Sequence, residues 1–240
     1  MLWLIVRSGF AGARAGRLLQ HCIDPRIQFR YRGLERADAR RVIFLGSIFL
    51  GLDSRAASKT GSWLRAGLAV LFGLGGAVFV GLTAQISIPL PFTPVPLTLQ
   101  TFSVLLVGAA LGSIRGASSM ALYLLVGVAG VPWFASHHSG WAFPSFGYIV
   151  GFIAAAWLVG RLAENGADRR VVPTIGMMAL GNVVIYAFGV ADLMLIAHLS
   201  LGKAIALGVL PFLIGDVIKI LLAAGLLPGT WKLINSRKDS

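Results

Sequence analysis

The sequence predicts an all-α integral membrane protein built as a bundle of six transmembrane helices. Of its 240 residues 57% are hydrophobic and only 12% are charged, whereas a soluble domain typically carries about 25% charged residues. Residues 66–114 and 116–160 contain no Asp, Glu, Lys or Arg at all. Because about 20 residues cross a bilayer, each of these stretches must hold more than one span.

Prolines and turn residues divide the first half of the membrane region. We expect the first span at residues 64–85, followed by a proline-rich break at 89–96. The second span covers 97–112 and the third covers 117–131. These two are short for a membrane span, so we expect some helices to be tilted or incompletely buried.

The second half divides in the same way. The fourth span covers residues 145–161, and the charged segment 164–170 follows it as a loop. We expect the fifth span at 172–190. The sixth covers 203–227, with Pro228 lying beyond its end.

The basic residues predict how these spans are oriented. Six spans place both ends of the membrane region on one side. Lys and Arg flank the first and last spans and occupy two of the connections: Lys59, Arg65, Arg115, Arg161, Arg169, Arg170, Lys232, Arg237 and Lys238. The connections at 86–96, 132–144 and 191–202 are poor in basic residues, with Lys203 beside the last. The positive-inside rule therefore predicts a multi-pass protein of the cell inner (plasma) membrane with both termini in the cytoplasm.

The composition divides the chain into two regions. Residues 1–60 hold eleven Lys or Arg against four acidic residues, and we expect them to be a dispensable cytoplasmic extension. A transit peptide or translation from an upstream start codon also fits this composition. Residues 61–240 form the six-helix membrane domain. The net charge of +12 lies mainly beside apolar runs, a pattern of cytoplasmic loops that predicts a lipid partner and no nucleic acid.

The segment AQISIPLPFTPVPLTLQ, residues 84–100, holds four closely spaced prolines: Pro89, Pro91, Pro94 and Pro96. Proline lacks an N–H and fixes its own φ, so this segment cannot be a helix. It is nevertheless uncharged and apolar, and irregular backbone does not face lipid. We therefore interpret it as a lid over an outward-facing site, with a packed structural turn as the alternative.

Two charged residues lie within the apolar sixth span, in PFLIGDVIKILLAA at 211–224. Asp216 and Lys219 would each cost about 2.5–3.5 kcal/mol at the centre of a membrane helix. Their i, i+3 spacing places them on one helix face, close enough to pair. We interpret them as one acceptor and one donor of a ligand site. The alternatives are a purely structural ion pair, or a lysine that reaches an interface.

Isolated polar residues within or beside the other spans are further candidates for ligand binding. We select Gln100, Tyr148 and Asn182, and note Gln85 and Tyr186 as similar positions. For each of them the alternative is a hydrogen bond between helices, worth about 0.6–2 kcal/mol.

A stripe of small residues marks one face of the first span. Ala69, Gly73, Ala77 and Gly81 recur every fourth residue, a spacing that lets helices approach closely. The stripe packs either within the bundle or against another membrane subunit.

No catalytic or metal-binding motif is present. His137 and His138 are adjacent, so they do not share a helix face, and no carboxylate or cysteine accompanies them. There is no nucleophile elbow, H-E-x-x-H motif or P-loop. We therefore expect neither a cofactor nor an enzyme activity, and an ATP-driven transporter would need its ATPase from another chain. Two alternatives stay open: an intramembrane enzyme using Asp216 and Lys219 as acid and base, and a proton-coupled secondary carrier with Asp216 as the proton site.

Three segments resemble the BioY family, the biotin-specific S components of energy-coupling factor (ECF) transporters. They are ISIPLP…PVPLTLQT within 84–135, GYIVGFIAAAWLVGRLAENG at 147–166, and LGVLPFLIGDVIKILLAAGLLP at 207–228, which holds a PF-x-x-GD-x-x-K block. The order and spacing are similar over residues 62–232. One departure is FPSFGY at 143–148, where Phe146 replaces a small residue of the family pattern.

The resemblance implies a six-helix bundle of ECF S-component type that binds biotin from outside with high affinity. It implies docking to a membrane T component and two ABC-type ATPase subunits, and inward release as the S component reorients. An apolar pocket with a few placed polar groups suits biotin. Asp216 would accept from a ureido N–H, and Lys219 would donate to the ureido carbonyl or to the carboxylate.

Overall fold

The structure is a computed structural model that describes residues 62–236. The extension predicted at 1–60 lies outside the described residues and stays a prediction. The described part contains six main helices: α4 (Ser62–Ala84), α5 (Gln100–Leu111), α6 (Ser113–Val128), α7 (Phe146–Glu164), α8 (Val171–Ile196) and α10 (Leu213–Ser236). Its shorter elements are β1 (Ser87–Ile88), β2 (Leu97–Thr98), α9 (Leu201–Gly208) and the 3-10 turns η1 (Ala135–His137), η2 (Ala167–Arg169) and η3 (Leu210–Phe212).

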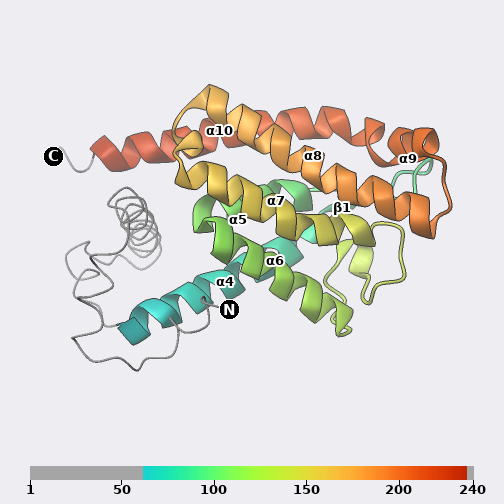
Figure 1. Cartoon of the computed structure of the whole chain (residues 1–240), viewed down its shortest axis with the longest axis horizontal. Coiled ribbons are helices and arrows are strands. Elements are labelled where there is room, and N and C mark those ends of the chain that lie inside the picture. The colour runs from blue at the N-terminus through green and yellow to red at the C-terminus, as the bar shows by residue number, and fades with distance from the viewer. Residues whose placement is uncertain (1–61, 237–240) are drawn as a thin grey trace, which may run out of the picture. The chain divides into compact units, whose positions relative to one another are not determined.

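Helix α7 is the centre of the bundle. It packs against α5, α6 and α8, while α4 covers α5 and α6, and α10 lies along α8 and α5 (Figure 1). Over its apolar window α7 is 56% buried, compared with 28% for α8 and 17% for the stretch Leu201–Leu233. A helix that is apolar on its exposed side is typical of a lipid-facing position. The peripheral helices show such sides, with Leu195 75% and Ile214 79% exposed.

The described helices agree with the predicted spans in number and order. Three segments are long and apolar enough to cross a membrane by length and composition: Phe146–Glu164, Val171–Ile196 and Leu201–Leu233. Helices α5 and α6 have only 12 and 16 residues. The prediction that the second and third spans are short is therefore confirmed.

The sixth span was predicted wrongly at both of its ends. Instead of one helix at 203–227, the chain forms α9, breaks at η3, and then begins α10, which runs through Pro228 to Ser236. Pro211 in η3 lacks the N–H that a continuous helix would need. At Pro228 the helix continues, because proline within a membrane helix is tolerated where neighbouring groups satisfy the freed backbone.

Helix α8 extends six residues past its predicted end and terminates at Ile196. Much of the connection predicted at 191–202 is therefore helical, and the segment between α8 and α9 is only residues 197–200. Asp192 does not end the helix, and its side chain packs against Gly147 at the start of α7. Helix α8 thereby remains packed on the first turn of α7.

A single residue, Gly112, joins α5 to α6. Its φ of +87° lies in the region that only glycine adopts readily. The carboxylate of Glu164 caps the start of α6: its Oε1 accepts from the Ser113 backbone N–H at 2.6 Å and from the Ser113 hydroxyl at 2.8 Å. A negative charge at a helix N-terminus is favourable because the exposed N–H groups point toward it. The third span therefore begins at Ser113, four residues earlier than predicted.

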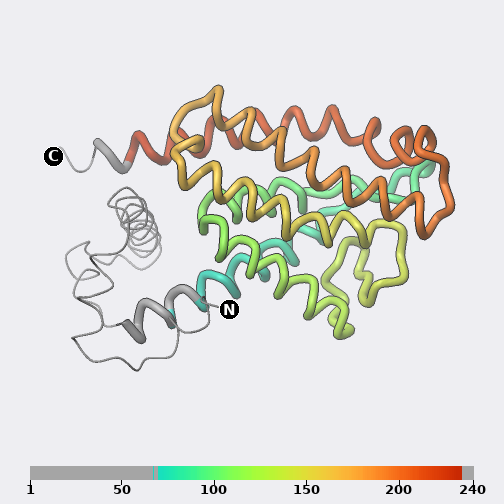
Figure 2. The backbone as a smooth tube through the Cα atoms, viewed as in Figure 1, coloured from blue at the N-terminus to red at the C-terminus, as the bar shows by residue number. Residues whose placement is uncertain are grey.

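The connections alternate between the two ends of the bundle. The β1–β2 hairpin, the segment 129–145 and α9 gather at one end, on the right in Figures 1 and 2. The turn between α5 and α6 and the connection between α7 and α8 lie at the opposite end. The predicted alternation is thus confirmed, and the assignment of the second end to the cytoplasm stays a prediction from the basic residues.

Candidate ligand-binding site

A pocket opens at the hairpin end of the bundle, among α5, α7, α8, α10 and the second strand of the hairpin. Its volume, counted together with the open mouth, is about 510 Å³. The polar side chains that line it are Thr98, Gln100, Thr101, Ser145, Tyr148, Tyr186, Asp216 and Lys219. The apolar lining is Val95, Pro96, Leu97, Ala135, Ile149, Phe152 and Phe212.

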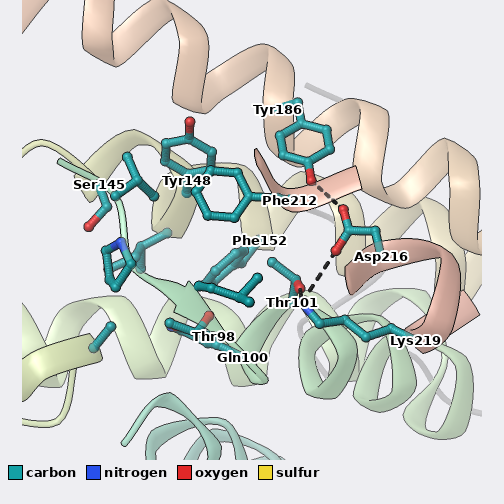
Figure 3. A pocket seen from close by; sticks show the side chains of 15 residues that line it. Thr98, Gln100, Thr101, Ser145, Tyr148, Phe152, Tyr186, Phe212, Asp216 and Lys219 are labelled. Carbon is teal, nitrogen blue, oxygen red and sulfur yellow. Dashed lines mark hydrogen bonds and ion pairs between the residues drawn. The ribbon is translucent and has the colours of Figure 1, made fainter. Parts of the chain in front are cut away.

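The predicted acid–base pair of α10 faces this pocket (Figure 3). Asp216 is only 4% exposed, and its Oδ1 lies 3.3 Å from the Lys219 Nζ. The hydroxyl of Tyr186 donates to the Asp216 Oδ2. Lys219 also donates to the Thr101 hydroxyl, at 2.9 Å. Four side chains from three helices therefore form one hydrogen-bonded cluster, the polar cluster, on one side of the pocket.

The polar cluster is suited to neutral polar groups of a ligand. Its opposite charges compensate each other within the low-dielectric interior, and each carboxylate oxygen has a donor. A carboxylate has about four acceptor positions, and an ammonium has three donors. Asp216 and Lys219 can thus bind one another and still offer an acceptor and a donor to a molecule in the pocket.

Gln100 begins α5 and is held in place by its own contacts. Its side-chain nitrogen donates to the Tyr123 hydroxyl at 2.9 Å, and that hydroxyl donates to the Trp133 carbonyl at 3.1 Å. Gln100 is 3% exposed. One N–H of the amide is therefore used within the bundle, and the amide oxygen and the second N–H are left for a ligand.

Tyr148 lies on the side of the pocket opposite Asp216 and Lys219, close to Ser145 (Figure 3). Its hydroxyl donates to the Gly208 carbonyl at 2.8 Å. Its ring lies against Gly189, where an added Cβ would come within 2.3 Å of the ring. Tyr148 therefore contributes a fixed aromatic wall, since its hydroxyl is already engaged.

Asn182 does not line this pocket. It lies beside a second, smaller cavity of about 180 Å³, together with Phe102, Leu105, Met178, Lys219 and Ile220. Asn182 precedes Tyr186 by four residues, which is one helical turn along α8. Asn182 thus lies one turn along α8 from the pocket-lining Tyr186, and its role in ligand binding stays a prediction.

The prolines of the hairpin have different positions. Pro96 lines the pocket, whereas Pro89, Pro91 and Pro94 are exposed. Strands β1 and β2 pair antiparallel and bring the two ends of the proline-rich segment together. The segment is thus the tip of a short hairpin at the pocket mouth, and Pro96 alone of the four proposed lid prolines touches the cavity.

The small-residue stripe of α4 is covered by the bundle itself. An added Cβ at Gly73 would contact the Ser119 hydroxyl, and one at Gly81 would lie 3.0 Å from the Trp133 ring. Ala77 is 1% exposed. Gly73, Ala77 and Gly81 therefore pack within the bundle, where α6 and the segment after it are the neighbours. The structure does not describe the Ala69 side chain. These contacts do not support docking through the stripe.

The segment before α7 is filled by aromatic rings. Phe146, the departure from the family pattern, meets Phe143 edge-on at 5.8 Å between ring centroids, and Phe143 stacks with His138 at 5.2 Å. The His138 Nδ1 lies 2.8 Å from the Ala135 carbonyl oxygen. Within residues 62–236 no three His, Cys, Asp or Glu side chains come together as metal ligands.

Sequence reasoning missed several residues of the site: Thr98, Thr101, Ser145, Phe152 and Phe212. Tyr186 was noted as a polar position but was not selected. A signal for Tyr186 was its distance of one turn from Asn182 on the same helix. Thr101 carries no such signal, because its partner Lys219 is 118 residues away in the sequence.

The fold defines the class of protein. A crystal structure described as the S-component for biotin from an ECF-type ABC transporter matches with a TM-score of 0.64, covering 72% of this chain and 95% of that chain. The sequence identity is 20%, so this likeness establishes the fold. The chain is an all-α membrane bundle of the ECF S-component type.

The particular family follows from the sequence comparison. The BioY family model matches residues 57–236, and the chain belongs to the BioY family. It is 37% identical over 165 residues to the biotin transporter BioY of Rhizobium etli, covering 65% of this chain and 88% of that protein. It is 41% identical over 144 residues to the biotin transporter BioY of Thermotoga maritima, covering 59% and 82%.

Proposed function

We propose that this protein is the substrate-binding S component of a vitamin uptake transporter, and that it captures biotin from outside the cell. Membership of the BioY family and the S-component fold support the proposal. The observation that carries it is the polar cluster of Asp216, Lys219, Tyr186 and Thr101 in an otherwise largely apolar pocket.

The chemistry of biotin is complementary to this pocket. Its ureido ring has two N–H donors and one carbonyl acceptor, while its thiophane ring and valeryl chain are apolar. Asp216 accepts from a ureido N–H, and Lys219 donates to the ureido carbonyl or to the carboxylate. Phe152 and Phe212 supply apolar surface for the ring and chain. A buried site that pairs each polar group of its ligand discriminates strongly against analogues that lack one.

Gln100 and Tyr148 complete the proposed site in different ways. The oxygen of Gln100 offers an acceptor near the start of α5, since its nitrogen is bound to Tyr123. Tyr148 packs its ring against the ligand. Pro96 and its neighbours on the hairpin close over the bound molecule and exclude water.

Transport requires partners. The sequence contains no P-loop, so energy for inward release comes from other chains: a membrane T component and two ABC-type ATPase subunits. The basic residues of the connections support a location in the inner membrane with both termini in the cytoplasm. The pocket then faces outward.

The two other functions are less well supported. The matched relatives are named as transporters, which does not favour an intramembrane enzyme. Such an enzyme would also need a catalytic group beyond Asp216 and Lys219, and the other polar groups lining the pocket are hydroxyls and one amide. For a proton-coupled secondary carrier, uptake would collapse with the proton gradient and survive loss of the ATPase partners.

Binding of radiolabelled biotin to the purified protein, without ATP, tests the proposal. We expect saturable binding that unlabelled biotin competes away and that thiamine leaves unchanged. Biotin methyl ester as a competitor locates Lys219: retained affinity places it at the ureido ring, and lost affinity places it at the carboxylate. A folded wild-type protein that bound no biotin would refute the proposal.

A further inference from the structure

We propose that the C-terminal end of α9 is a latch for the hairpin, and that Thr93 is the positioning residue whose hydroxyl holds it closed. The hairpin tip is the proline-rich segment 89–96 between β1 and β2. This inference rests on the proposed function, because it describes how the same pocket opens and closes around its ligand.

The end of α9 exposes backbone carbonyls that need partners. The last carbonyls of any helix have no N–H within the helix to bind, and here η3 follows with Pro211, which has no N–H to offer. Two side chains satisfy these carbonyls. The Thr93 hydroxyl donates to the Leu207 carbonyl at 2.7 Å, and the Tyr148 hydroxyl donates to the Gly208 carbonyl at 2.8 Å.

The two hydrogen bonds reach α9 from different elements of the structure. Tyr148 belongs to α7, the helix at the centre of the bundle. Its bond fixes the end of α9 to the rigid part of the bundle. Thr93 belongs to the hairpin tip, so its bond fixes the tip to α9. The end of α9 is therefore the point at which the hairpin is tied to the bundle.

The hairpin tip has little else to hold it at Thr93. The neighbouring Phe92 is 60% exposed, and Pro94 is exposed as well. The Thr93 hydroxyl also accepts from the Val95 backbone N–H at 3.2 Å, which stiffens the tip locally. Val95 is only 6% exposed and lines the pocket together with Pro96. Releasing Thr93 from α9 thus uncovers the pocket wall made by these two residues.

The inference predicts a change in exchange rates. Loss of one hydrogen bond raises the population of the open state by about three- to tenfold. With Thr93→Val we expect both association and dissociation of biotin to accelerate by that factor, so that the equilibrium affinity changes less than either rate. Thr93→Ser, which keeps the hydroxyl, should exchange biotin at close to the wild-type rate.

A matched control separates the latch from the general loss of a threonine hydroxyl. Thr230 donates to the Leu226 carbonyl at 2.7 Å within α10 and is exposed. We expect Thr230→Val to leave the exchange rates unchanged. Dissociation from Thr93→Val at the wild-type rate would overturn the inference.

A second measurement needs no ligand. The chain has one cysteine, Cys22, so a Cys22→Ser background with Val95→Cys carries one thiol, beneath the hairpin. Adding Thr93→Val should raise its rate of labelling by a water-soluble maleimide by about three- to tenfold, whereas adding Thr93→Ser should not. Accelerated labelling, together with no biotin binding by the folded wild-type protein, would refute the proposed function but support the latch. Biotin binding with unchanged labelling would refute the latch alone.

Discussion

Asp216 and Lys219 show what residue types and spacing can and cannot reveal. Their i, i+3 spacing within an apolar helix predicted a pair on one face, and the structure places both in the pocket wall. Their other partners, Tyr186 on α8 and Thr101 on α5, are brought to them only by the packing of three helices. No local pattern encodes that packing, so the polar cluster could be predicted only in part.

Replacing the carboxylate tests the pair directly. In Asp216→Asn the shape is kept, but the ligand loses a charged acceptor, and a hydrogen bond to a charged group contributes about 1.5–3 kcal/mol. We expect biotin affinity, measured by calorimetry, to fall by about tenfold or more. The control is Glu164→Gln, the same chemical change at the opposite end of the bundle. It should lower thermal stability and leave the affinity near wild type; equal losses in both variants would contradict this account.

Tyr186 provides a second test at this scale. Tyr186→Phe removes the hydroxyl that donates to Asp216, and a hydrogen bond to a charged group contributes about 1.5–3 kcal/mol. We expect about a tenfold or greater loss of biotin affinity. Combined with Asp216→Asn, the loss should be less than additive, because both changes act on one contact. Full additivity in equilibrium binding would show that Tyr186 acts independently of Asp216.

The ends of the helices were predictable where the polarity of the sequence changes, and less predictable where it does not change. The fourth span was predicted at 145–161 and forms Phe146–Glu164, because charged residues end it. The sixth was misjudged, since the sequence is apolar on both sides of Pro211, where the helix breaks, and since α10 continues through Pro228 into the more polar residues 229–236. Whether proline breaks a membrane helix depends on the groups around it. The helix breaks at Pro211, just after the end of α9, where the last carbonyls accept hydrogen bonds from Thr93 and Tyr148.

The Gly112 turn allows a test of how the short helices are joined. Alanine at Gly112 would strain the positive φ and place its Cβ 2.7 Å from the Glu164 Oε1. We expect Gly112→Ala to lower the thermal unfolding temperature in detergent clearly. Gly130→Ala isolates the strain alone, because Gly130 has φ +110° and nothing within 4 Å of an added Cβ. Equal destabilisation by the two variants would show that the Glu164 contact contributes nothing.

At the scale of the whole molecule, the number and order of the six main helices within residues 62–236 followed from the sequence, because long uncharged stretches and their breaks are properties of composition. The alternation of connections followed as well. The arrangement around α7 did not, since apolar periodicity does not tell a helix that faces lipid from one that faces other helices. The same limit led the small-residue stripe of α4 to be considered for a partner, while its contacts lie within the bundle.

The role of the N-terminal extension is testable at this scale. The family model begins at residue 57, and every residue placed in the pocket lies between 95 and 219. A protein consisting of residues 58–240 should therefore bind biotin with unchanged affinity and take it up when its partners are present. Loss of binding by this truncated protein, with the full-length protein as the control, would contradict a dispensable extension.

The central claim is that the polar cluster exists to bind biotin. Its most direct test is a calorimetric titration of biotin, without nucleotide, into the wild type and into the double variant Asp216→Leu/Lys219→Leu. Because apolar residues replace a buried ion pair with little loss of stability, the variant should fold and unfold like the wild type. We expect saturable 1:1 binding by the wild type and none by the variant. Wild-type affinity in the double variant would contradict the account.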